Sequence, residues 1–284
     1  MFATLRGLAL GLLDAALPQT CIACGTWIPA ESGVACPACR AELLLDLDRP
    51  ACDRCGRTLP PQAIHPDGCA RCRTEHFWNV SGVARAGLYG KRMRSLLVDL
   101  KHRGDERNGV FAAELLVAAV RRQAWAAEIE CLAPVPMHWL RRLQRPCDHA
   151  RILAEHVGRR LGLPLVRLVR RVRHTPSQTG LPSKHARFAN VRGCFAPAGG
   201  LRGLATWPAR GTRVRGRTVC IVDNLMLSGA TVCEVAKVLR AAGARRVYAA
   251  VVARPAAPGD APTSAGGAIG VGADAEAGPA APSA

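Results

Sequence analysis

The sequence predicts an α/β fold, in which a parallel sheet is flanked by helices and preceded by a small cysteine-rich domain. Two observations lead to this prediction. Short β-branched runs alternate with helical patterns over residues 78–255, which is typical of α/β architecture. In addition, eight of the thirteen cysteines lie between Cys21 and Cys72. A length of 284 residues suits one medium domain and one small one.

The composition excludes several other classes of protein. Hydrophobic residues make up 49% of the chain, which is too much for a wholly disordered protein. Every apolar stretch of about 18 residues is broken by a charge or a proline, so we expect no membrane span. Aromatic residues are only 4% of the total, which argues against a base-stacking platform. With no clear export signal, we expect a cytoplasmic protein.

The chain divides into four predicted segments. Residues 1–20 form a leader helix with Leu5, Leu8 and Leu12 on one face; a signal peptide is the alternative, but Asp14 interrupts the apolar run and no clean cleavage site follows. Residues 21–77 form the cysteine-rich domain and residues 78–255 the α/β domain. Residues 256–284 are mostly Ala, Gly, Pro and Ser, and we expect this tail to be disordered.

The clustered cysteines form four Cys-x-x-Cys pairs. Two such pairs supply the four thiolates of a tetrahedral zinc site, and in a reducing compartment clustered pairs indicate metal rather than disulfides. The pairs can be matched in three ways, of which we choose sequential matching into a tandem (double) zinc ribbon. All positions are cysteine, which favours two structural zinc ions over a catalytic ion with an open position. The predicted ligands are Cys21, Cys24, Cys36, Cys39, Cys52, Cys55, Cys69 and Cys72.

The α/β domain shows a strand–loop–helix–strand unit near its end. Residues 218–223 (TVCIVD) are a continuous apolar run, as expected of a central parallel strand buried on both faces. A helical pattern over residues 231–242 closes at Gly243, and a further strand is predicted over residues 246–253. Upstream, residues 131–135 read as a buried strand and residues 148–161 as a helix.

The loop after the TVCIVD strand has the composition of a phosphate-binding turn. In an α/β protein, ligands bind where a parallel strand ends and leads into a helix. Ser228 and Thr231 offer hydroxyls, Gly229 allows close backbone approach, and the helix N-terminus presents free N–H groups to an anion. Asp223 is placed to accept hydrogen bonds from sugar hydroxyls. The alternative, an ordinary strand–helix turn with Ser228 as helix cap, stays open at this point.

Residues 219–231 (VCIVDNLMLSGAT) resemble the signature of type I phosphoribosyltransferases. Together with the cysteine pairs, they make the chain similar to the ComF/GntX family of bacterial competence and DNA-uptake proteins. The similarity covers about residues 15–255. It extends to four further segments in the expected order: residues 89–104, residues 134–142 (PVPMHWLRR), residues 173–181 (RHTPSQTGL) and residues 187–193 (RFANVRG).

The resemblance implies binding of phosphoribosyl pyrophosphate (PRPP) with Mg2+. In the family's pattern, Asp223 and Asn224 would contact the ribose hydroxyls. The 5′-phosphate would lie in the loop formed by Leu227, Ser228, Gly229, Ala230 and Thr231. The pyrophosphate would face Val135, Pro136 and Lys101. Residues 170–192 would form a mobile flap whose cations stabilise the leaving pyrophosphate, and the catalytic candidates are Arg173, Lys184 and Arg187. His138 and His174 fall in the same motif loops.

The chain departs from the family's pattern at three places. Asn224 stands where a second acid is usual, Leu227 stands where a Thr is usual, and residues 146–149 (PCDH) replace Gly-Phe-Asn-Gln. Two functions therefore compete. One is a phosphoribosyltransferase, acting on an unknown acceptor and involved in DNA uptake. The other is a non-catalytic adaptor that binds nucleic acid, or docks a partner, on the same fold.

The basic charge suggests a polyanionic partner. The formal net charge is +18, and residues 141–192 contain thirteen Lys and Arg against only Asp148 and Glu155. Basic stretches of this kind attract polyanions, so we expect single-stranded DNA or another nucleic acid to bind the Arg141–Arg192 stretch through its backbone. A solvated arginine-rich face, or a field that serves only a polyphosphate substrate, are the alternatives. DNA-uptake proteins are a further expected class of partner.

Overall fold

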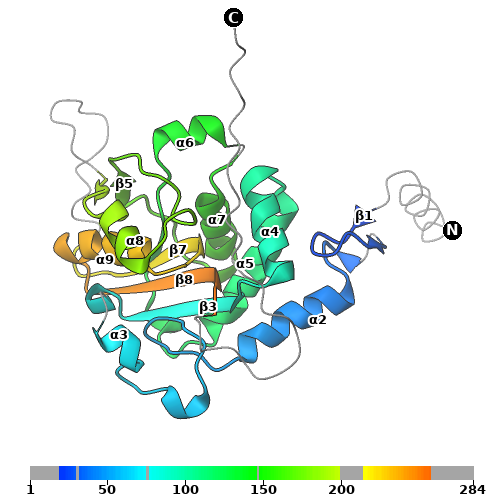
Figure 1. Cartoon of the computed structure of the whole chain (residues 1–284), viewed down its shortest axis with the longest axis horizontal. Helices are drawn as coiled ribbons and strands as arrows, with labels where there is room; N and C mark the ends of the chain where they lie inside the picture. The colour runs from blue at the N-terminus through cyan, green and yellow to red at the C-terminus, as the bar shows by residue number, and fades with distance from the viewer. Residues whose placement is uncertain (1–18, 30–31, 75–76, 146, 199–213, 257–284) are drawn as a thin grey trace, which may run out of the picture.

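The computed structural model describes residues 19–29, 32–74, 77–145, 147–198 and 214–256 (Figure 1). The expected leader helix lies outside the described residues over 1–18, whereas its last two residues, Gln19 and Thr20, form the strand β1 and are not helical. The expected disordered tail lies outside the described residues from residue 257 onward. Within these ranges, no helix combines the length and the apolar character that crossing a bilayer needs.

The main sheet has four parallel strands in the order β3 (Gly82–Leu88), β8 (Arg246–Arg254), β7 (Thr218–Leu225) and β4 (Cys131–Pro134). β7 is an interior strand, in which Val219 pairs with Cys131 of β4 on one side and with Val247 of β8 on the other. The prediction of a parallel sheet with a central, fully buried TVCIVD strand is therefore confirmed.

Helices cover both faces of this sheet (Figure 1). Alternate side chains of β7 enter two different cores, as the period of two in a strand requires. Cys220 and Val222 face the core built on α4 (Lys91–His102), α5 (Glu106–Arg121) and α7 (His149–Leu161). Val219 and Ile221 face the core built on α9 (Ala230–Ala241).

The predicted elements of the α/β domain agree with the structure to within two residues. The largest difference is at β7, which continues past the predicted end at Asp223 as far as Leu225. The reason lies in the neighbouring strand, because Leu225 still pairs with Ala253 of β8. The left-handed Gly243 follows α9 as expected, with φ of 94°.

The cysteine-rich segment consists of short elements. The first half contains β1 (Gln19–Thr20), which pairs antiparallel with β2 (Trp27–Ile28), then α2 (Pro37–Leu45) and the 3-10 turn η2 (Asp46–Asp48). The second half contains η3 (Pro61–Ala63), α3 (Ala70–Thr74) and η4 (Phe77–Asn79). We call these halves the first ribbon and the second ribbon.

The two ribbons pack on different cores. Ile28, Cys39 and Leu43 of the first ribbon join the core of α5 and α7. The cysteines of the second ribbon and Phe77 join the core of α9. Figure 1 shows this separation, with β1 at the right of the view and α3 at the lower left, on the side where α9 lies.

The remaining elements lie outside the main sheet. η5 (Ala126–Glu128) leads into the start of β4, where Glu128 accepts a hydrogen bond from Arg246 at the start of β8. The others follow β4 in the chain: α6 (Trp139–Gln144), β5 (Val169–Arg171), α8 (Lys184–Val191) and β6 (Phe195–Pro197). β5 and β6 pair antiparallel as a small separate sheet, and α8 lies between them in sequence. The segment of the expected flap, residues 170–192, therefore begins in β5 and contains α8, and β6 follows it.

Candidate functional site

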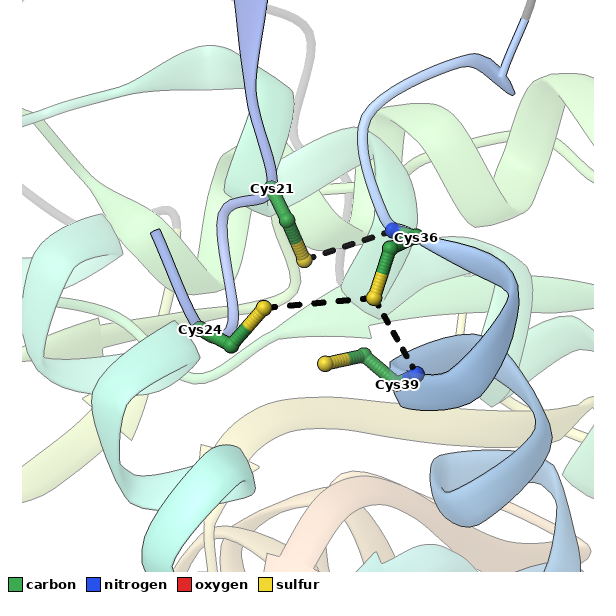
Figure 2. Close-up of side chains that lie close together, drawn as sticks. All are labelled: Cys21, Cys24, Cys36 and Cys39. Carbon is green, nitrogen blue, oxygen red and sulfur yellow. Dashed lines mark hydrogen bonds between the residues drawn. The ribbon is translucent and has the colours of Figure 1, made fainter. Parts of the chain in front are cut away.

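The eight predicted zinc ligands form two compact groups. In one, the side chains of Cys21, Cys24, Cys36 and Cys39 lie close together (Figure 2), and their sulfur atoms are all within 4.8 Å of one another. In the other, Cys52, Cys55, Cys69 and Cys72 do the same, within the same limit. The sequential matching of the pairs is therefore the one that the fold adopts, and we call the two groups the first tetrad and the second tetrad.

Each tetrad is supported by its own backbone. The amide of Cys36 donates to Cys21 Sγ at 3.3 Å in the first tetrad, and the amide of Cys69 donates to Cys52 Sγ at 3.3 Å in the second. The glycines that follow Cys24 and Cys55 are left-handed, with φ of 77° at Gly25 and 68° at Gly56. Glycine adopts this conformation without steric cost.

The donor chemistry of both tetrads fits a zinc ion. Four sulfurs at this separation match a tetrahedral thiolate site. All four cysteines of the second tetrad are buried, and burial raises the pKa of the Cys72 thiol to about 12. Thiolates in such a place need a cation to hold them. The two tetrads accordingly indicate two structural zinc ions, with no ligand position left open for catalysis.

The candidate phosphate site lies at the carboxyl edge of the main sheet. The end of β4 lies beside the last part of β7 there, because the amide of Val135 donates to the carbonyl of Val222 at 3.0 Å. This bond places Val135 and the buried Pro136 next to Asp223. Two of the segments that the resemblance assigned to one site are thus brought together by sheet pairing.

The loop between β7 and α9 has the backbone of an anion-binding turn. Gly229 is left-handed with φ of 85°, and α9 starts at the next residue, Ala230. Ser228 is buried and its Oγ accepts a hydrogen bond from the amide of Ala230 at 3.3 Å. This contact has the form of a helix cap, so the hydroxyl of Ser228 serves the helix terminus in this state. Leu227 and Thr231 are half-buried beside it.

Asp223 is the acidic group of this edge. The residue is 9% exposed, and the amide of Asn224 donates to its Oδ1 at 2.8 Å. Burial raises the pKa of Asp223 to about 7, while the charges of Arg171 and Lys101 act in the opposite direction. Both cations therefore lie within electrostatic reach of the carboxyl. Lys101 was predicted; Arg171 was not, and its only sequence signal is the alternation of the short strand β5.

A group of cations surrounds this edge. Burial, followed by the charges of Arg145, Lys101 and Arg141, lowers the pKa of His149 to about 3, so this imidazole is neutral at pH 7. The rings of His138 and His174 lie 5.2 Å apart, which brings the two histidine-bearing motif loops together. The local charge is positive and suits a polyphosphate.

The three predicted catalytic cations hold the flap together in this structure. The guanidinium of Arg173 donates to the carbonyls of Asn190 at 3.2 Å and Arg192 at 2.8 Å. Arg187 donates to the carbonyls of Gln178 at 3.1 Å and Leu181 at 3.0 Å. Lys184 lies 5.8 Å from the ring centre of Phe188. Their contact with a pyrophosphate stays a prediction, and it would require these internal bonds to be exchanged.

Comparison with known proteins agrees with this organisation. Residues 12–73 match the family model of a double zinc ribbon domain, and residues 147–266 match that of a phosphoribosyl transferase domain. The chain is 28% identical over 240 residues to Competence protein F of Haemophilus influenzae, covering 82% of this chain and 96% of that protein.

Two solved structures are also similar. TT1426 from Thermus thermophilus is 20% identical with a TM-score of 0.28, over 52% of this chain and 83% of that one. UMP synthase of Leishmania donovani is 14% identical with a TM-score of 0.29, over 75% of this chain and 30% of that one.

The order of the two domains, the paired cysteine tetrads and the identity to Competence protein F agree with one another. The chain is a ComF-like protein, in which a double zinc ribbon precedes a phosphoribosyltransferase domain.

Proposed function

We propose that this protein binds PRPP with Mg2+ at the carboxyl edge of the main sheet. The observation that carries the proposal is the sequence of groups along β7 and its loop: the buried carboxyl of Asp223, the left-handed Gly229 and the N-terminus of α9 directly behind it. The first suits ribose hydroxyls, and the other two present backbone amides to a phosphate. The nearby positive charges of Lys101 and Arg171 suit the pyrophosphate.

Phosphoribosyl transfer breaks the bond between the anomeric carbon and the pyrophosphate oxygen and forms a bond from that carbon to the acceptor. Positive charge develops on the sugar and negative charge on the leaving group. Fixed cations at the pyrophosphate side stabilise this separation, and Lys101 and Arg171 are the candidates to supply them. Mg2+ bound together with PRPP would neutralise further negative charge, and the carboxyl of Asp223 offers an oxygen ligand of the kind that this ion prefers.

The binding proposal is tested by titration calorimetry of the full chain with PRPP and Mg2+. The double variant Ser228→Ala, Thr231→Ala removes two hydroxyl partners, and at roughly 1 kcal/mol each it should weaken binding about tenfold or more. Thr20→Ala, at an exposed position in β1, is the control and should leave affinity unchanged. Equal affinities for all three proteins would remove the phosphate-loop assignment.

A second function is favoured by one residue. Asn224 stands next to Asp223 and is buried, where the resemblance leads us to expect a second acid. An amide can hydrogen-bond a hydroxyl, but it carries no charge to attract a cation. A protein that binds PRPP without turnover, as an adaptor, is therefore the alternative to an active transferase.

The variant Asn224→Asp separates these two functions. Pyrophosphate release is measured with PRPP and Mg2+, with water as the acceptor of the phosphoribosyl group, for the natural protein and the variant. A large gain in the variant would show a weakened enzyme, and no release from either protein would favour the adaptor. The control is Asp67→Asn, which exchanges the same two residue types in the opposite direction at an exposed position. It should leave pyrophosphate release unchanged.

We further propose that the protein takes part in DNA uptake from the cytoplasmic side. The relative named Competence protein F supports this, since that name is carried by a protein similar over most of this chain. The basic stretch at residues 141–192 supports a nucleic-acid partner. Deletion of the gene in its host should lower uptake-dependent transformation, and complementation with the full chain should restore it.

A further inference from the structure

The second tetrad lies in the same core as the loop that we propose binds phosphate. Its cysteines belong to the same buried cluster as Val83 of β3, Met226 of the loop and Ala230 at the start of α9. Its backbone is also tied to the sheet, because the amide of Val83 donates to the carbonyl of Asp53 at 2.7 Å. The first tetrad shares none of this packing, since its buried cysteines belong to the opposite core.

Phe77 connects the second ribbon to the loop directly. It follows α3, the helix that carries Cys72, and its side chain is fully buried. A Cβ atom built on Gly229 would lie 2.5 Å from Cζ of Phe77. The ring of Phe77 is therefore in contact with the backbone of Gly229, at the turn where the loop becomes α9.

Arg254 completes the connection from the other side. Its guanidinium donates a hydrogen bond to the carbonyl of Cys55, inside the second tetrad, and lies 5.8 Å from the ring centre of Phe77. Its neighbour Ala253 accepts a hydrogen bond from the amide of Met226, at the start of the loop, at 3.0 Å. Contacts therefore run without a gap from the carbonyl of Cys55 through Arg254 and the ring of Phe77 to both ends of the loop.

We infer that zinc at the second tetrad holds the phosphate loop in its binding shape through Phe77, which acts as a positioning residue. The inference rests on the proposed function for the identity of the ligand. Without zinc, four buried thiols have no common centre, and the turns that orient Phe77 and the carbonyl of Cys55 lose their fixed point. Zinc occupancy and ligand binding are then coupled, and by linkage each strengthens the other by the same factor.

The coupling is tested first without any ligand, by amide hydrogen exchange of residues 226–231. Phe77→Ala removes the ring below Gly229, and we expect these amides to exchange at least tenfold faster, while those of α5 keep their rates and the chain keeps two zinc ions by elemental analysis. Phe77→Leu should give a smaller effect. Trp78→Ala is the matched control, because the adjacent Trp78 is 70% exposed.

The metal is tested in the same way on the natural protein and on a first-tetrad variant. Chelator removal of the second zinc should accelerate exchange at residues 226–231, whereas Cys24→Ser, which disables the first tetrad, should not. Unchanged loop exchange after loss of the second zinc would overturn the inference. Should Phe77→Ala fail to fold, Phe77→Leu and the chelated natural protein decide the question.

The ligand is tested last, by calorimetry with PRPP and Mg2+. We expect Phe77→Ala to weaken binding about tenfold with two zinc ions still bound, which lies within the usual range of about 5–150-fold for coupled sites. We also expect saturating PRPP to slow release of the second zinc and to leave the first unaffected. If the natural protein does not bind PRPP, the proposed function fails, and the exchange rates still decide the coupling. The inference is refuted if Phe77→Ala keeps the loop exchange rates and the PRPP affinity of the natural protein.

Discussion

A single buried carboxyl links the proposed ligand site to the stability of the chain. Burial raises the pKa of Asp223 to about 7, whereas an aspartate in an unfolded chain titrates near 3.9. Between these values the folded chain holds the proton more tightly than the unfolded chain. The stability of the ligand-free protein should therefore fall as the pH rises through this window.

Asp223→Asn removes this dependence. We expect the variant, with zinc bound, to exceed the natural protein in unfolding free energy at pH 8 by roughly 1–4 kcal/mol, and by less at pH 6. The same variant should bind PRPP more weakly, because an acceptor for the ribose hydroxyls is removed. Urea unfolding at both pH values measures the first effect and calorimetry the second.

The control for this prediction is Asp67→Asn, since Asp67 is exposed. Its pH dependence should match that of the natural protein. The prediction fails if the gain in unfolding free energy of Asp223→Asn over the natural protein is no larger at pH 8 than at pH 6. The carboxyl would then be ionised at little cost in the folded protein.

Residues whose roles depend on spacing could be predicted from the sequence. The spacing of Cys21 and Cys24 is enough to predict a metal-binding pair, because the local backbone determines how the two sulfur atoms lie. Arg171, Phe77 and Arg254 act through contacts between segments far apart in the chain, and nothing near them in sequence marks those contacts. Arg254 follows the strand predicted over residues 246–253 and donates to a carbonyl in the cysteine-rich segment. Only the assembled sheet brings these two groups together.

At the level of elements, the two ribbons share a sequence pattern but not an environment. Cys24 is exposed and Cys36 half-buried in the first tetrad, whereas all four ligands of the second are buried. The guanidinium of Arg92 on α4 also reaches Cys39 Sγ at 2.8 Å. A metal ion at the first tetrad is accordingly reachable by a chelator in solution, and one at the second requires the ribbon to open first.

We predict that a chelator removes zinc from the full chain in two phases of equal amplitude. The fast phase belongs to the first tetrad and the slow phase to the second, with rates that differ by about tenfold or more, because opening a buried unit costs additional free energy. The absorbance of a coloured zinc chelator follows both phases.

Cys24→Ser identifies the phases. It should abolish the fast phase and leave the slow phase at its natural rate. A single phase in the natural protein, or loss of the slow phase in the variant, would show that the exposure of the ligands does not control metal release.

Sequence patterns predict most elements of the α/β domain because each carries its own period. The run at residues 218–223 is continuous and apolar, and the helix at residues 149–161 ends at Gly162, which is left-handed with φ of 68°. The predicted end of β7 lies two residues too early, because pairing with β8 rather than local propensity decides where that strand stops.

On the scale of the whole molecule, the ribbons occupy opposite faces of one sheet. The sequence predicts two ribbons in tandem but holds no signal for this arrangement, which arises because β3 follows the second ribbon immediately and fixes it next to α9. The predicted basic surface also differs from the one in the structure. The basic stretch is continuous in sequence, yet Arg142, Arg151 and Arg160 of that stretch form ion pairs within the molecule.

The positions most open to a polyanion are therefore fewer than the sequence implies. Arg167 and Arg170 flank the start of β5 and are exposed. Replacing both by Glu should weaken binding of a single-stranded oligonucleotide, and the decline of log affinity with log salt should become shallower by about 0.7 for each phosphate that the protein no longer neutralises. Fluorescence anisotropy over a range of salt concentrations measures both quantities.

The matched control places the same charge change elsewhere. Arg71→Glu with Arg73→Glu alters two exposed arginines of α3 and lowers the net charge equally. If binding depends on the basic stretch, this control should retain the natural salt slope, since exposed charges beyond about one Debye length are screened. Equal losses of affinity in both double variants would assign binding to overall charge alone. If the natural protein does not bind the oligonucleotide at about 0.05 M salt, the positive charge near the carboxyl edge of the sheet serves only the polyphosphate.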